Sequence, residues 1–78
     1  MDFSTFVISL GSSAMLHLGK GGADGATGEV NMPLARQTID ILAMLEAKTA
    51  GNLTSEEANL LKDVLYQCRV ACLEAGRG

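Results

Sequence analysis

The stretch AKTAGNLTSEE (Ala47–Glu57) decides the fold, because it ends one helix and starts another within a few residues. Gly51 is the residue type that most readily takes the left-handed conformation found after helix C-termini. Thr54 and Glu57 have the S/T-x-x-E spacing of a capping box, in which each side chain accepts a hydrogen bond from the other residue's backbone amide. A linker this short makes the two helices antiparallel neighbours, so the sequence predicts an antiparallel helical hairpin.

Hydrophobic periodicity predicts the two helices of this hairpin. Residues 33–50, capped at Asn31 or Met32, place their apolar positions on one broad face. Residues 55–75 form the second helix, which has one main apolar face. A second apolar stripe lies nearly opposite that face and consists of Tyr66, Val70 and Leu73. A hairpin buries one face of each helix, so this second stripe needs another partner.

A third helix is expected at residues 3–18, after a cap at Asp2. Its apolar residues follow the i, i+3, i+4, i+7 pattern and form a stripe of Phe3, Phe6, Val7, Leu10, Ala14 and Leu18. The rest of its circumference carries hydroxyl groups rather than charges, which is typical of an internal helix. The small residues at 11–14 would let another helix approach closely.

Residues 19–31 are expected to be a flexible, glycine-rich surface loop, because five glycines fall within ten positions. This loop does not match a phosphate-binding motif. The sequence around Lys20 is not G-x-x-x-x-G-K-[ST], and G-x-G-x-x-G would need glycine where Asp24 stands. The loop is therefore interpreted as a connector within a single all-α domain that spans residues 1–78.

The composition favours self-association. Of the 78 residues, 47% are hydrophobic and only 19% are charged, so few charged side chains are available to cover the surface. A single core at this size rarely supplies more than about 3–5 kcal/mol of stability. We therefore expect a homo-oligomeric helical bundle, most simply a homodimer. The interface is expected on the first and third helices, at Phe3, Phe6, Val7, Leu10, Tyr66, Val70 and Leu73.

Charge and cysteine usage exclude several classes of protein. The net charge is −3 and the six basic residues are spread singly, so the chain does not resemble a nucleic-acid-binding protein. The first basic residue is Lys20, so a secretory signal with a positive N-terminal region is not expected. Cys68 and Cys72 lie four positions apart in one helix, where a disulfide would close almost no loop. Free thiols and no signal indicate the cytoplasm.

No metal, cofactor or catalytic site is expected. Cys68, Cys72 and His17 could be considered as zinc ligands, but structural zinc sites usually have four ligands, and both cysteines lie on the main apolar face. His17 is interpreted as a partly buried residue at a helix end, where the dipole favours it. The acidic residues form no evident general acid/base pair, and no Ser/His/Asp or Cys/His pattern is present. The chain is therefore not expected to be an enzyme.

One alternative is association with a membrane. Residues 3–19 carry no charge apart from a possible one on His17, and this length is close to that of a membrane span. The segment also contains several hydroxyl residues and Gly11, whereas membrane spans are usually richer in Leu, Ile and Val. A protein anchored by its N-terminal helix is thus the second interpretation.

The sequence resembles the small bacterial proteins grouped as DUF1844. The resemblance is carried by F-x-x-F-V-x-S-L at residues 3–10 and by I-D-x-L-x-M-L-x-x-K-T-x-G-N-L-T-x-E-E at residues 39–57. It implies a small, mostly helical bacterial protein of unknown function and supplies no activity. Three residues of the second motif have no local structural task and are candidate contacts for a protein partner: Lys48, Asn52 and Glu56. The expected function is a protein–protein interaction module, acting as a regulatory or structural adaptor.

Overall fold

A computed structural model describes residues 2–19 and 30–76 of the chain. It contains three helices, α1 (Phe3–His17), α2 (Met32–Lys48) and α3 (Ser55–Gly76). The described residues contain no strand, so the all-helical prediction is confirmed. Most of the predicted glycine-rich loop, at positions 20–29, lies outside the described residues.

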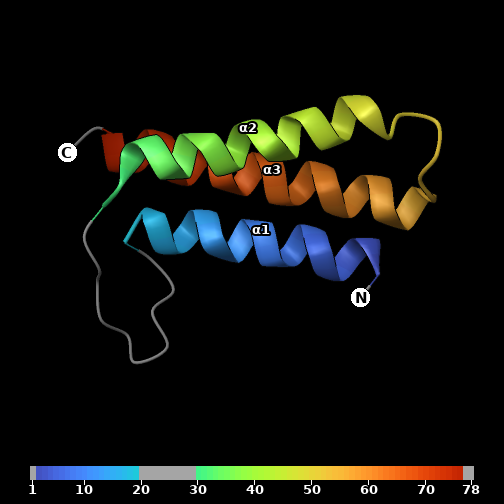
Figure 1. The fold of residues 1–78 in the computed structure, drawn as a ribbon, viewed down its shortest axis with the longest axis horizontal. Helices are drawn as coiled ribbons and strands as arrows, with labels where there is room; N and C mark the ends of the chain where they lie inside the picture. Colours follow the sequence, from blue (N-terminus) through green and yellow to red (C-terminus); the bar gives the residue numbers. More distant parts are fainter. Residues whose placement is uncertain (1, 20–29, 77–78) are drawn as a thin grey trace.

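The three helices pack side by side, and each helix contacts the other two. Figure 1 shows α2 running opposite to α1 and α3. The backbone amide of Asn31 donates a hydrogen bond of 2.6 Å to the carbonyl oxygen of His17, which ties the end of α1 to the start of α2. The core lies between the helices and takes fully buried side chains from all three, namely Val7, Leu42, Leu61 and Leu65.

Short polar side chains cap the first two helices. The Asp2 carboxylate accepts a hydrogen bond of 2.8 Å from the Thr5 amide, and this bond lowers the pKa of Asp2. The Asn31 side chain accepts a hydrogen bond of 3.1 Å from the Leu34 amide, so Asn31 rather than Met32 caps α2. Each cap satisfies one of the backbone amides that a helix N-terminus leaves without an intrahelical partner.

The turn between α2 and α3 contains the predicted capping box. The Thr54 hydroxyl accepts a hydrogen bond of 3.1 Å from the Glu57 amide, and a Glu57 carboxylate oxygen accepts one of 2.9 Å from the Thr54 amide. Gly51 has φ +85°, the left-handed conformation expected of it. The α2 helix nevertheless ends at Lys48, two residues before the predicted end, because the backbone already leaves helical geometry at Thr49 on its way into this reversal.

Removal of the Thr54 side chain is expected to test the capping box. Thr54→Ala should lower the free energy of unfolding by about 0.5–2 kcal/mol, because the Glu57 amide loses its acceptor. Urea unfolding followed by circular dichroism measures this change. Ser55→Ala is the matched control, since the neighbouring Ser55 residue is exposed and its hydroxyl makes no hydrogen bond within residues 2–19 and 30–76. Equal losses in the two variants would show that the reciprocal hydrogen bonds do not stabilise the turn.

The N-terminal helix takes part in the core of this chain. It is 15 residues long, and Val7, Gly11 and Ala14 are buried on its inner face. Within residues 2–19 and 30–76, no helix combines the length and the apolar character needed to cross a membrane.

Candidate interaction surface

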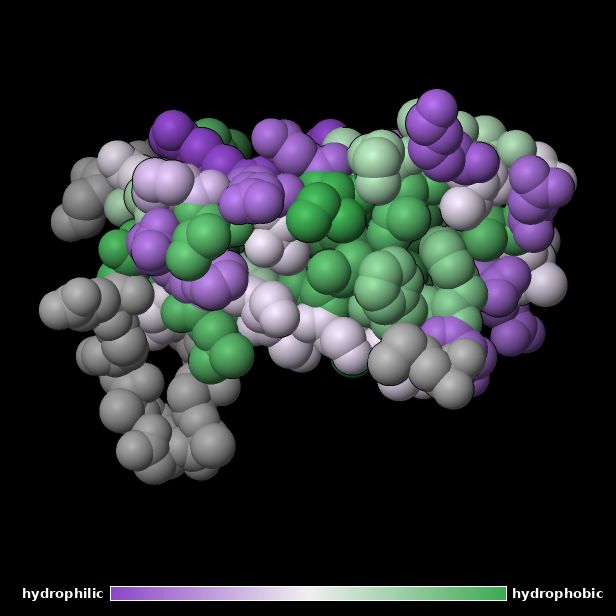
Figure 2. All heavy atoms as spheres, in the orientation of Figure 1, coloured by the Kyte–Doolittle hydropathy of each residue, from purple (hydrophilic) through white to green (hydrophobic). Residues whose placement is uncertain are grey.

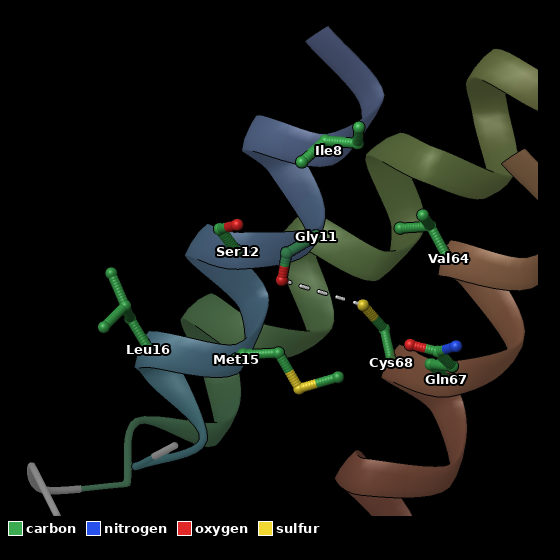
Figure 3. Close-up of a pocket in the computed structure, with 8 residues that line it drawn as sticks. All are labelled: Ile8, Gly11, Ser12, Met15, Leu16, Val64, Gln67 and Cys68. Atoms are coloured by element: carbon green, nitrogen blue, oxygen red, sulfur yellow. Dashed lines mark hydrogen bonds between the residues drawn. The ribbon is translucent and has the colours of Figure 1, made fainter. Parts of the chain in front are cut away.

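Gly11 is a point of close contact between α1 and α3. A Cβ atom built at Gly11 would lie 2.7 Å from Cγ1 of Val64, so any side chain at this position would force the Val64 side chain or the helices to shift. Next to this contact, the Cys68 thiol donates a weak hydrogen bond of 3.9 Å to the carbonyl oxygen of Gly11 (Figure 3). The absence of a side chain at Gly11 thus sets how closely the two helices pack, as the small residues predicted.

A groove of about 360 Å³ runs along the junction of α1 and α3. Figure 3 shows Met15 reaching between the two helices, while Val64 and Cys68 project from α3. We call this feature the α1–α3 groove, and its lining consists of Ile8, Gly11, Ser12, Met15, Leu16, Val64, Gln67 and Cys68. None of these side chains carries a charge, because the only ionisable group among them is the Cys68 thiol, and burial raises its pKa and keeps it neutral. The groove therefore favours apolar occupants.

The outer side of α3 presents an apolar stripe to solvent. Tyr66 is 68% exposed and Leu73 is 65% exposed, while Val70 between them is half-buried. We call these three residues the α3 ridge. A hollow of about 270 Å³ lies beside Tyr66 and Val70 and shares Met15 and Gln67 with the α1–α3 groove, so the ridge and the groove form one continuous surface.

A second groove follows the other side of the α3 ridge. This α2–α3 groove measures about 390 Å³, and its lining consists of Arg36, Ile39, Asp40, Arg69, Cys72 and Leu73. It differs from the α1–α3 groove in carrying three ionisable charged groups. Leu73 borders it, so the α3 ridge separates an uncharged groove from a charged one.

The α1 residues predicted at an interface separate into different environments. Val7 is fully buried in the core of its own chain, so it cannot contact a second chain as predicted. Phe3 and Leu10 are half-buried against that core, and Phe6 is 37% exposed. The physical reason is that α1 packs on both α2 and α3, which buries the centre of its stripe and leaves only an edge exposed.

Hydrophobic residues also gather on the face of the molecule shown in Figure 2. Figure 2 shows them between α1 and α2, toward the N-terminal end of α1. Phe6 is an exposed large apolar side chain in the N-terminal half of α1. The apolar periodicity of α1 did not identify Leu16 as an interface residue. Leu16 is 52% exposed and lines the α1–α3 groove together with Ile8. The spacing of eight residues between Ile8 and Leu16 could have indicated this, because it places both on the same side of a helix.

The two thiols do not converge. Cys68 is buried and lines the α1–α3 groove, whereas Cys72 is half-buried and lines the α2–α3 groove. His17 is the last residue of α1 and is half-buried. Among the residues that the structure describes, no three His, Cys, Asp or Glu side chains are grouped so that they could hold a metal ion.

Lys48, Asn52 and Glu56 are all exposed around the turn between α2 and α3. A hollow of about 210 Å³ lies at this end of the molecule, lined in part by Glu46, Leu53 and Lys62. None of the three candidate partner contacts lines it. They therefore remain accessible without forming a concave site.

The fold and these surfaces define a small three-helix protein whose exposed apolar ridge lies between two grooves. The chain belongs to the family described as a domain of unknown function (DUF1844), whose family model matches residues 1–74. Neither a curated protein nor a solved structure matches the chain.

Proposed function

We propose that this chain is a protein–protein interaction module that assembles with a second copy of itself through the α3 ridge and the α1–α3 groove. The observation that carries the proposal is the exposed ridge of Tyr66, Val70 and Leu73 beside an uncharged groove. Full burial of a side chain such as Val or Leu stabilises an assembly by roughly 1.5–3 kcal/mol relative to leaving it exposed. Exposed apolar surfaces that are continuous in this way are typical of interaction sites.

The arrangement of ridge and groove suits a twofold dimer. In a twofold interface the same surface of both copies is used, so it must be complementary to itself. Because the ridge lies beside the groove on one face, the ridge of one copy can enter the groove of the other, and the reverse contact forms at the same time. Packing of helix ridges into helix grooves is the usual geometry of helical bundles. The proposed assembly is thus a bundle in which the hairpin of α2 and α3 contributes α3 to the interface.

The proposal makes the chain a regulatory or structural adaptor that binds proteins and does not catalyse a reaction. It places the adaptor in the cytoplasm, where Cys68 and Cys72 would stay reduced. The candidate contacts Lys48, Asn52 and Glu56 lie at the turn between α2 and α3, outside the proposed dimer surface, so they stay available to a further protein.

A charge placed on the α3 ridge or in the α1–α3 groove is expected to dissociate the dimer. Light scattering coupled to gel filtration should give the wild-type protein twice the mass of one chain, which is 8.1 kDa. Tyr66→Lys and Ile8→Lys should each weaken the dimer at least tenfold, because each would bury a lysine in an apolar interface. Sedimentation equilibrium measures the dissociation constants.

Met44→Lys is the matched control, since Met44 is an exposed apolar residue on α2 that lines neither groove. It should leave the dimer intact. A wild-type chain that stays monomeric at all concentrations tested would contradict the proposal. Equal dissociation by Met44→Lys and Tyr66→Lys would contradict the assigned surface.

A further inference from the structure

We infer that the α2–α3 groove binds an acidic amphipathic segment of a partner protein. Arg36 from α2 and Arg69 from α3 both line this groove, and both are exposed. In the described part of the chain, neither guanidinium has an ion pair or a side-chain hydrogen bond. Two unpaired arginines therefore face one apolar depression.

The sequence explains why these arginines lack partners. Asp40 is four residues after Arg36 on the same helix, but a basic residue that precedes an acidic one at this spacing forms the weaker of the two possible pairs. Arg69 has no acidic residue three or four positions away on α3. Both guanidinium groups are thus free to bind a carboxylate from another molecule.

The groove has the charge and the apolar lining that such a segment needs. Two guanidiniums and one carboxylate leave it positive, on a chain whose net charge is −3. Ile39 is buried at its side, Cys72 is half-buried, and Leu73 is exposed at its edge. An apolar side chain of the partner would lie on Ile39 and Cys72, inside the edge formed by Leu73, while its neighbouring carboxylates reach the arginines.

The chemistry favours a carboxylate over a phosphate or a nucleic acid. The planar guanidinium group binds either a carboxylate or a phosphate through two parallel hydrogen bonds, so the charge of the ligand and the apolar lining decide between them. Asp40 would repel a doubly charged phosphate, and the apolar lining offers it nothing. The negative net charge of the chain opposes nucleic-acid binding. A partner helix with glutamates beside a leucine matches both parts of the groove.

A peptide titration tests this inference on the full-length chain. The probe is an acetylated and amidated 14-residue helical peptide with leucines on one face and glutamates beside them, and the control peptide replaces every glutamate by glutamine. The glutamate peptide should shift the amide resonances of residues 36–40 and 69–73, and it should bind roughly tenfold more tightly than the glutamine peptide. Added salt should weaken the binding.

Substitutions assign the binding to the two arginines. Arg36→Gln and Arg69→Gln should each weaken binding of the glutamate peptide about 3–10-fold. Lys62→Gln removes the same charge from an exposed position on α3 outside this groove and should leave the affinity unchanged. Circular dichroism verifies that all three variants keep the wild-type fold.

Three results would overturn the inference: no resonance shifts up to millimolar peptide, equal affinity for the two peptides, or an equal loss in Lys62→Gln, which would indicate attraction to the whole surface. Light scattering on Arg36→Gln and Arg69→Gln keeps this site separate from self-association. Neither arginine lines the α1–α3 groove or belongs to the α3 ridge, so both variants should remain dimeric.

Discussion

Replacement of Leu42 by alanine is expected to lower the free energy of unfolding by about 2–5 kcal/mol, the largest effect of any single truncation discussed for this chain. Leu42 is 0% exposed and lies in the core cluster with Val7, Leu61 and Leu65. Loss of its side chain removes buried apolar surface and leaves a cavity between all three helices. A domain of this size has only about 3–5 kcal/mol available from one core, so Leu42→Ala should be largely unfolded at 25 °C.

Urea unfolding followed by circular dichroism measures this effect at one fixed protein concentration, because self-association adds to the apparent stability. Leu34→Ala is the matched control, since the same truncation occurs on the same helix at an exposed position. Its cost should stay below about 1 kcal/mol. A similar loss in both variants would contradict the placement of Leu42 at the centre of the core.

A leucine at position 11 is expected to be the second most disruptive change. Gly11→Leu should lower the free energy of unfolding by about 2–3 kcal/mol, because even its Cβ atom would lie 2.7 Å from the stiff side chain of Val64. Gly11→Ala introduces a smaller conflict and also gains about 1 kcal/mol of helix propensity, so its net loss should be about 0–2 kcal/mol. Chemical unfolding of both variants measures the two effects.

A double-mutant cycle identifies the cause of this effect. Val64→Ala removes the side chain that the new Cβ atom would meet, so Gly11→Ala combined with Val64→Ala should be more stable than the sum of the two single changes by about 0.5–3 kcal/mol. Gly51→Ala is a suitable comparison, because its Cβ atom would meet nothing within 4 Å and its strain comes from φ +85°. Val64→Ala should not rescue it. Additive effects at Gly11 would show that α1 and α3 are not in close contact there.

The helix ends could be predicted because the interactions that form them are local. Asp2, Asn31 and Thr54 each accept a hydrogen bond from a residue three positions ahead in the sequence, so the spacing alone identifies the cap. Gly51 has the expected left-handed conformation for the same reason. The largest difference is at the end of α2, which lies two residues before the predicted position because Thr49 and Ala50 already belong to the turn. The end of α1, the start of α2 and the end of α3 each differ from the prediction by one residue.

The candidate surfaces were less predictable, because exposure depends on contacts between distant residues. Phe6 and Val7 are neighbours in one apolar stripe, yet Phe6 is exposed and Val7 is fully buried. Periodicity assigns both residues to the same side of a helix, but it does not show how many neighbours the helix has. The α3 ridge was the exception, since a stripe opposite the main apolar face of α3 is exposed under any packing that buries that face.

The amino-acid sequence by itself determined the class of fold, the starts of the helices, the reversal at Gly51 and the family, because each of these depends on residues that lie close together in the chain. Only the tertiary structure decided that Val7 belongs to the core, that Val64 packs against Gly11, and that Arg36 and Arg69 line one groove. These residues meet because three helices pack against one another at a particular rotation and depth. Close packing of side chains between helices sets that geometry, and no local pattern of residues specifies it.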